Sequence, residues 1–113
     1  MNTFLTFSFM LLIAPITIHA LHVIVDPGHG GENHGAVYYG VKEADINLQV
    51  GSHLARLLKN DSRFKVTLTR HKDTELSLEE RAELARRAGG NVFLSIHTNA
   101  FNRPQAKGVE FYF

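Results

Sequence analysis

Hydrophobic and polar positions divide the chain into short β-type runs and two amphipathic stretches of helical period. The β-type runs, each stopped by polar or turn residues, cover 21–25, 64–69, 92–96 and 108–113. Apolar positions spaced by three and four residues from 44 to 58 predict a helix that ends near 59–61. Ser77 and Glu80 have capping-box spacing ahead of a second helix that runs to about Arg87.

The order of these elements predicts an α/β domain with a largely parallel or mixed sheet flanked by helices. An apolar run that reaches Phe113 has no polar fringe of the kind that usually ends a domain. We therefore expect residues 21–113 to form the N-terminal portion of an incomplete domain.

The first twenty residues differ from the rest because they contain no Lys, Arg, Asp or Glu. Their apolar block, from Phe4 to Ala14, is shorter than the about 20 residues that span a bilayer, so we expect no stable membrane span. A small residue at Ala20 offers a cleavage point for a signal peptide over 1–20. A first element of the domain or an uncleaved anchor is the alternative, since no basic residue precedes the block. A signal peptide predicts export to the periplasm, the cell wall or the extracellular space.

Composition excludes several classes of protein. A length of 113 residues suits one modest domain. Lys and Arg number 12 against 11 Asp and Glu, which is not the basic excess of a nucleic-acid-binding protein. The chain has no cysteine, which excludes disulfides, thiol catalysis and Cys-ligated zinc. A metal site would have to use carboxylates and some of the seven histidines.

Three residues are candidates for such a site. His29 lies in a glycine-rich segment after the first strand, and His97 directly follows the strand 92–96. The carboxyl ends of parallel strands share one edge of a sheet, where ligands bind, and Glu43 can reach that edge from the start of the first helix. Two histidines and one carboxylate with an open fourth position are the ligands of a catalytic zinc. A tight structural turn with structural histidines is the alternative.

Other sites fit the sequence less well. The glycine-rich segment lacks the Gly-Lys-Ser/Thr of a phosphate-binding P-loop, and Asn33 stands where G-x-G-x-x-G needs glycine. Ser95 lies near His97 but has no nucleophile-elbow pattern around it. The remaining histidines are weaker ligand candidates, and we expect most of them to be solvated: His19, His22, His34, His53 and His71.

Six segments together resemble, in order and spacing, the zinc-dependent N-acetylmuramoyl-L-alanine amidases of the Amidase_3 type. They are 23–31, 35–36, 42–48, 69–73, 78–81 and 93–100. The resemblance covers almost all of 21–113 and implies that His29, Glu43 and His97 are zinc ligands. It also implies structural roles for Arg70 and Arg81.

The resemblance implies a peptidoglycan hydrolase that acts in cell wall turnover or daughter-cell separation. Such enzymes cleave the amide between the lactyl group of N-acetylmuramic acid and the L-alanine of the stem peptide. The implied mechanism uses zinc to activate water and to polarise the amide carbonyl. Peptidoglycan is the implied partner, and the sequence identifies no activator protein.

One departure from the family concerns the general base. The resemblance implies a further glutamate near the C-terminus, and no residue of this sequence matches it. Glu32 and Glu110 are poor substitutes, because Glu32 lies where the family needs no acid and Glu110 lies in a predicted strand. We therefore assign no catalytic residue. The alternatives to an amidase are a non-catalytic, zinc-retaining peptidoglycan-binding module or truncated relic, and a metal-dependent hydrolase of another amide.

Overall fold

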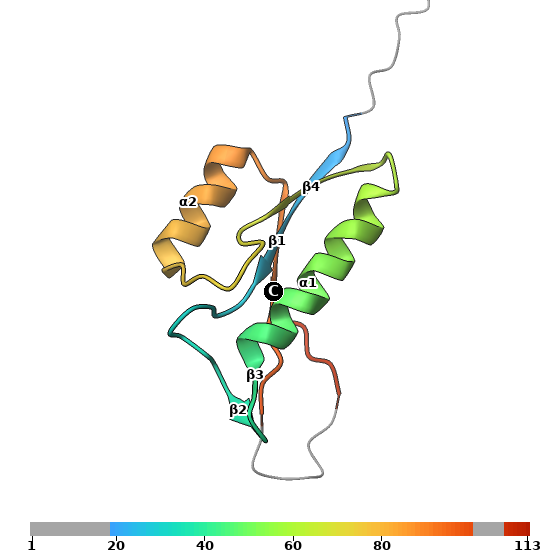
Figure 1. Ribbon diagram of the computed structural model, residues 1–113. Coiled ribbons are helices and arrows are strands. Elements are labelled where there is room, and N and C mark those ends of the chain that lie inside the picture. Colours follow the sequence, from blue (N-terminus) through green and yellow to red (C-terminus); the bar gives the residue numbers. More distant parts are fainter. Residues whose placement is uncertain (1–18, 101–107) are drawn as a thin grey trace, which may run out of the picture.

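The computed structural model describes residues 19–100 and 108–113 (Figure 1). The predicted signal peptide lies almost wholly outside these residues. Along the chain the elements are β1 (Leu21–Pro27), β2 (Val37–Tyr38), β3 (Val41–Lys42), α1 (Glu43–Lys59), β4 (Phe64–Leu68), α2 (Leu78–Ala88) and β5 (Val92–Ile96). No helix in 19–100 or 108–113 has the length and apolar character needed to cross a membrane.

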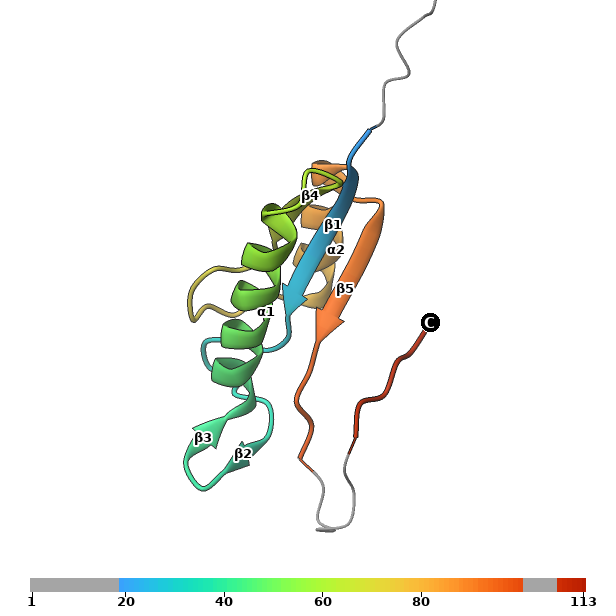
Figure 2. The ribbon, with the colours of Figure 1, turned by 90° about the vertical axis from the view of Figure 1, so that its right-hand side faces the viewer.

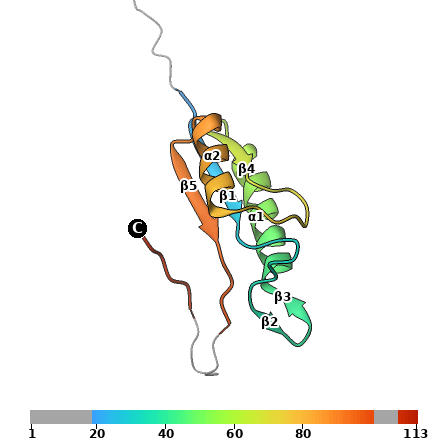
Figure 3. The same ribbon diagram turned by 90° about the vertical axis from the view of Figure 1, so that its left-hand side faces the viewer.

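The central sheet has three strands in the order β4-β1-β5, and both pairings are parallel. Helix α1 lies on one face of this sheet and α2 on the other (Figures 2 and 3). The predicted α/β class with a parallel sheet flanked by helices is therefore confirmed. In the register, Ile24 of β1 lies opposite Thr67 of β4 and Phe93 of β5.

Strand β1 supplies the core because its side chains alternate between the two helix-covered faces. Val25 points toward α1, which comes so close that a Cβ on Gly51 would lie 3.5 Å from the Val25 side chain and 2.7 Å from Pro27. Ile24 points to the other face, and a Cβ on Gly90, just after α2, would lie 2.3 Å from it. Small residues thus let both helices pack tightly on the middle strand.

The helix signals in the sequence are confirmed. In α2, the Ser77 side chain accepts from the Glu80 N–H at 3.1 Å, and the Glu80 carboxylate accepts from the Ser77 N–H at 2.7 Å. Gly89 ends this helix in the left-handed conformation with φ 68°, as helix C-termini favour. Helix α1 begins at Glu43, one residue before the predicted start, and ends at Lys59 as expected.

A hairpin within the glycine-rich segment was not predicted. Strands β2 and β3 pair antiparallel, and the turn between them uses two positive φ values, 49° at Tyr39 and 78° at Gly40. Figures 1 and 2 show this hairpin beyond the carboxyl end of β1, directly before α1. Two residues per strand are too few to produce a recognisable alternation of polar and apolar positions.

One expectation is wrong. Residues 108–113 alternate like a strand, but they are exposed and form none, because no described strand pairs with them. Among the five weaker histidine candidates, most of which were expected to be solvated, His22 is the buried exception, since it lies within β1 and its Nε2 is 2.9 Å from the Thr67 hydroxyl. The end of β1 also extends two residues past the predicted Val25.

Candidate metal centre

The three predicted ligands meet at the carboxyl end of the parallel sheet. His29 follows β1, Glu43 is the first residue of α1 and His97 directly follows β5. Each offers one ligand atom, and these atoms all lie within 4.8 Å of one another. Oε1 of Glu43 lies 3.4 Å from Nε2 of His29 and 3.1 Å from Nδ1 of His97. The fold thus brings together residues separated by up to 68 positions in the sequence.

Glu43 is held as a buried anion. Its Oε2 accepts from the Ala36 N–H at 2.9 Å, and its Oε1 accepts from the Thr98 N–H at 3.1 Å. Burial alone would raise the pKa of this carboxyl, but the hydrogen bonds from Ala36, His97 and Asn47 outweigh burial, and the net pKa is lowered. A metal ligand must be deprotonated, so the environment prepares Glu43 for that role.

His29 has the orientation of a metal-ligating imidazole. Its Nδ1 lies 2.8 Å from Oδ1 of Asn33, and the same oxygen accepts from the Gly35 N–H at 3.4 Å. Nδ1 of His29 is therefore the protonated nitrogen, as is usual when the other nitrogen binds a metal. The Nε2 lone pair then faces the carboxylate of Glu43, and a cation bound between the two would stabilise that arrangement. The donor set therefore fits a divalent metal such as zinc.

Two glycines leave space for the ligand side chains. A Cβ on Gly28 would lie 2.3 Å from Cε1 of His97 and 2.4 Å from its Nε2. A Cβ on Gly35 would lie 2.6 Å from the His29 ring and 2.7 Å from Oε2 of Glu43. The glycine-rich segment therefore serves a close approach of side chains to the backbone, rather than a phosphate cradle.

Arg70 holds the backbone beside two of the ligands. Its guanidinium donates to the carbonyls of Pro27 at 2.8 Å, Gly28 at 3.0 Å and Ala44 at 2.8 Å. Gly28 precedes His29 and Ala44 follows Glu43, so one buried side chain joins the loop after β1 to the start of α1.

Arg81 fixes the same loop from the side of α2. It donates to the His29 carbonyl at 2.9 Å and to Oδ1 of Asp26 at 2.7 Å, inside the fold. Asp26 also accepts from the hydroxyls of Thr69 at 2.6 Å and Ser95 at 2.8 Å. The hydroxyl of Ser95 is thus engaged with Asp26, which leaves the nucleophile hypothesis without support.

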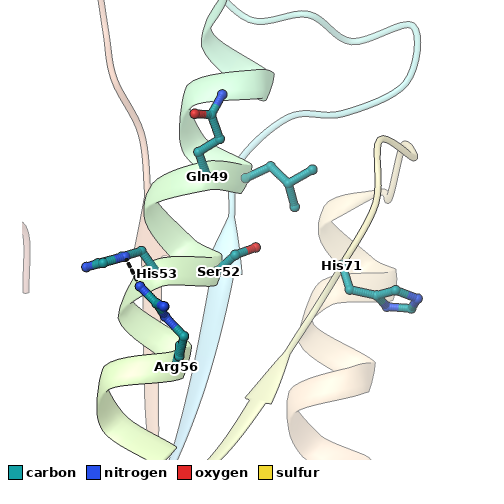
Figure 4. Close-up of a pocket in the computed structure, with 6 residues that line it drawn as sticks. Gln49, Ser52, His53, Arg56 and His71 are labelled. Carbon is teal, nitrogen blue, oxygen red and sulfur yellow. Dashed lines mark hydrogen bonds between the residues drawn. The ribbon is translucent and has the colours of Figure 1, made fainter.

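The remaining candidates lie apart from this centre. Glu32 and Glu110 are exposed and neither belongs to the three-residue cluster. His53 and His71 line an open pocket on the outer side of α1 (Figure 4). In that view His53 lies beside Arg56, at 2.9 Å, while His71 points away from the helix. These two histidines do not converge on a common point.

Comparison with known proteins decides the family. The sequence profile of the Amidase_3 family, described as N-acetylmuramoyl-L-alanine amidase, matches residues 23–113. The chain belongs to this family. The three candidate ligands all lie within the matched region, as do Arg70 and Arg81.

Relatives are found among both sequences and solved structures. The chain is 39% identical to the probable N-acetylmuramoyl-L-alanine amidase AmiB of Haemophilus influenzae, covering 94% of this chain and 24% of that protein. An N-acetylmuramoyl-L-alanine amidase of Clostridium difficile 630 superposes with a TM-score of 0.72 at 37% identity, covering 78% of this chain and 48% of that one. The CwlD amidase of Clostridioides difficile, solved with the GerS lipoprotein, has a TM-score of 0.70 at 31% identity, covering 76% and 52%. The chain thus spans about a quarter of the first relative and about half of the solved amidase chains.

Sequence reasoning missed three polar residues around the ligands: Asn33, Asn47 and Thr98. A signal for Asn47 was present, because it is a polar residue on the buried side of α1. The buried residues of that helix are Glu43, Ala44, Asn47, Gly51 and Ala55. An amide among small residues on such a face indicates a specific hydrogen-bonding role.

Proposed function

We propose that this chain carries the zinc centre of an N-acetylmuramoyl-L-alanine amidase, with His29, Glu43 and His97 as the ligands. The observation that carries the proposal is the convergence of two imidazoles on a buried, ionised carboxylate at the carboxyl edge of the sheet. Membership of the amidase family supports zinc and a peptidoglycan amide as the metal and the substrate.

The centre is open on the side where a substrate would enter. The side chain of His97 is 42% exposed and that of His29 is 23% exposed, while the side chain of Glu43 is only 3% exposed. When bound, zinc would supply Lewis acidity, which acidifies water and polarises the amide carbonyl. Glu43 would hold a negative charge against the ion, and the Asn33 contact would keep Nε2 of His29 available as a ligand.

The general base is not among the residues at this centre. A base must reach the attacking water to within about 3 Å, and Glu43 is the one carboxylate in the cluster within 19–100 and 108–113. We therefore assign the metal ligands and leave the base unassigned. Three candidate ligands without a second carboxylate beside them in 19–100 or 108–113 also fit an alternative, a zinc-retaining module that binds peptidoglycan without cleaving it.

We further propose that residues 1–20 form a signal peptide and that residues 21–113 belong to the exported catalytic domain. The uncharged apolar start of the chain supports this assignment, and so does a substrate that lies outside the cytoplasmic membrane. Cell wall turnover or daughter-cell separation is the process that such an amidase would serve.

The first test is metal content. The 113-residue chain is loaded with zinc, dialysed and assayed for bound metal beside His29→Ala, His97→Ala and the surface control His53→Ala. We expect about one zinc per chain in the parent and in the control, and strongly reduced zinc in the two ligand variants. A parent that retains no zinc, or a His29→Ala variant that retains all of it, contradicts the proposal.

The second test separates the two functions. The zinc-loaded chain is incubated with purified peptidoglycan, with and without a chelator, and released stem peptide is measured. Release that the chelator abolishes supports the amidase and excludes the binding module. Zinc-dependent sedimentation with peptidoglycan, without release, supports the module and contradicts an active enzyme in this chain.

A further inference from the structure

Asn47 is a wholly buried amide whose hydrogen bonds all lead toward the metal centre. Its Nδ2 donates to the Gly28 carbonyl at 3.2 Å and to Oε1 of Glu43 at 3.5 Å, and its Oδ1 accepts from the Thr98 hydroxyl at 3.0 Å. Gly28 directly precedes His29, and Thr98 directly follows His97. One side chain therefore contacts all three segments that supply the candidate ligands.

Local structure gives no reason for asparagine at this position. Asparagine is a weaker helix former than leucine or alanine, and position 47 lies within α1. Burying an amide costs free energy unless its hydrogen bonds are made, and an apolar residue would fill the same space without that cost. The value of Asn47 must lie in its particular contacts.

Apart from the candidate ligand Glu43, the other side chains near the centre join fewer segments. Arg70 reaches the carbonyls of Gly28 and Ala44, which connects the loop after β1 to α1. Asn47 adds the connection to the end of β5, through Thr98. The Thr98 N–H donates in turn to Oε1 of Glu43, so the amide and the carboxylate hold the same segment from two sides.

We infer that Asn47 is a positioning residue that sets the spacing of His29, Glu43 and His97, so that metal affinity depends on a side chain that touches no metal. This inference rests on the proposed metal centre. Loss of a partner that orients metal ligands lowers metal affinity by about 10-fold to 100-fold, and we expect an effect in that range for Asn47→Leu.

The test uses cobalt as a spectroscopic substitute for zinc in the full 113-residue chain. Asn47→Leu removes all three hydrogen bonds with little change in volume. Thr98→Val removes only the hydroxyl that binds Oδ1. Because Thr98 is partly exposed, this variant should fold and can be tested even if Asn47→Leu does not fold. Thr67→Val is the matched control, because it deletes an equivalent hydroxyl, bonded to His22 at 2.9 Å, that contacts no ligand segment.

We expect Asn47→Leu to bind cobalt at least tenfold more weakly than the parent and with a changed visible absorption spectrum. Thr98→Val should weaken binding by a smaller factor, while Thr67→Val binds like the parent even where its melting temperature falls. Parent-like affinity and spectrum in Asn47→Leu, or equal loss of affinity in Thr98→Val and Thr67→Val, would overturn the inference.

A metal-free measurement separates this inference from the proposed function. The ring centroids of His29 and His97 lie 4.8 Å apart, close enough for a cross-relaxation signal between ring protons in NMR. If the parent binds no metal, the proposed function fails and this signal still decides the inference. Its loss in Asn47→Leu but not in Thr67→Val supports positioning by Asn47, and its persistence in Asn47→Leu overturns it.

Discussion

Strands β1 and β5 each lead to a histidine of the proposed metal centre, yet they lie in different environments. In the sequence, both strands are short runs of mostly apolar residues, and in the structure they pair with each other. In β1, Ile24 is 1% exposed, whereas its partner Phe93 in β5 is 46% exposed. The difference arises because β1 lies between two strands, and β5 pairs only with β1 among the described residues. An apolar run predicts a strand, but its place in the strand order decides its burial.

The same contrast extends to the ligands that follow the strands. The loop that carries His29 is held by two buried guanidinium groups, which bind successive carbonyls from Pro27 to His29. His97 is held by its contact with Glu43 and by packing against Gly28, and it remains substantially exposed. The proposed centre therefore combines one histidine fixed by the interior with one at the edge of the fold.

Removal of the Arg81 side chain tests the buried contacts that hold the His29 loop. It should cause the largest loss of unfolding free energy. Arg81→Met leaves Asp26 as a buried carboxylate without its cation, and breaking such a pair costs about 3–5 kcal/mol of unfolding free energy. Urea unfolding of the variant measures the loss. Arg86→Met on the same helix is the control, because its ion pair with Glu83 is exposed and its loss should have a far smaller effect. Equal effects of the two variants would refute a central role for the Asp26 network.

A paired substitution across the two strands sharpens the comparison. Ile24→Ala should cost about 2–5 kcal/mol, the usual range for a fully buried Ile. Phe93→Ala, at the register partner, should cost less than about 2 kcal/mol, because half-exposed side chains lose less buried area. Both values come from urea unfolding at one protein concentration. Equal losses of unfolding free energy in the two variants would mean that Phe93 is as buried in solution as Ile24.

Much of this arrangement could be predicted from the sequence. The apolar runs located β1, β4 and β5, and the Ser77 capping box located α2, because these signals are local. The meeting of His29, Glu43 and His97 could be predicted because residues after parallel strands share one edge, whatever their separation in sequence. The prediction of a strand at 108–113 was wrong. Alternating apolar and polar positions indicate a tendency to form a strand, but a strand also needs a partner to pair with.

The supporting contacts could not be predicted, since they depend on the three-dimensional register. Arg70, Asn47 and Thr98 come from three different elements, and only the folded chain shows that their polar atoms reach the ligand segments. The burial of His22 could not be predicted for the same reason, because its hydrogen-bond partner Thr67 lies on another strand.

A methyl group at Gly28 tests how the exposed histidine, His97, is held. We expect a smaller change in free energy than for the core substitutions. Gly28→Ala places a Cβ within 2.3 Å of the His97 ring, so the ring must move away from Glu43. We expect metal affinity to fall about tenfold, which corresponds to about 1.4 kcal/mol. The melting temperature should change little, because the displaced ring is partly exposed. Ser52→Ala, on the exposed side of α1, is the control. A large fall in melting temperature with unchanged affinity would contradict this account of the edge ligand.

The turn before β4 makes an additional contact with β1 that β5 lacks among the described residues. Weakening this turn should have the smallest effect of the changes considered. The Arg63 carbonyl accepts from the Leu21 N–H at 2.8 Å, which ties the start of β1 to this turn. Hydrogen bonds from the Arg63 side chain and N–H lower the pKa of Asp61 from its usual 3.8 to about 2.

A lowered carboxyl pKa stabilises the fold above the unfolded value and loses that contribution as the pH falls through the folded value. The stabilising contribution of Asp61 should therefore be complete above about pH 3.8 and disappear toward pH 2. Because Asp61 is exposed, the effect is small, and Asp61→Asn should flatten the decline of the urea midpoint only within that window. NMR titration of the Asp61 carboxyl provides the direct measurement. A titration midpoint near 4 would show that Arg63 does not bind this carboxylate in solution, and that the pair contributes nothing to the turn that contacts the start of β1.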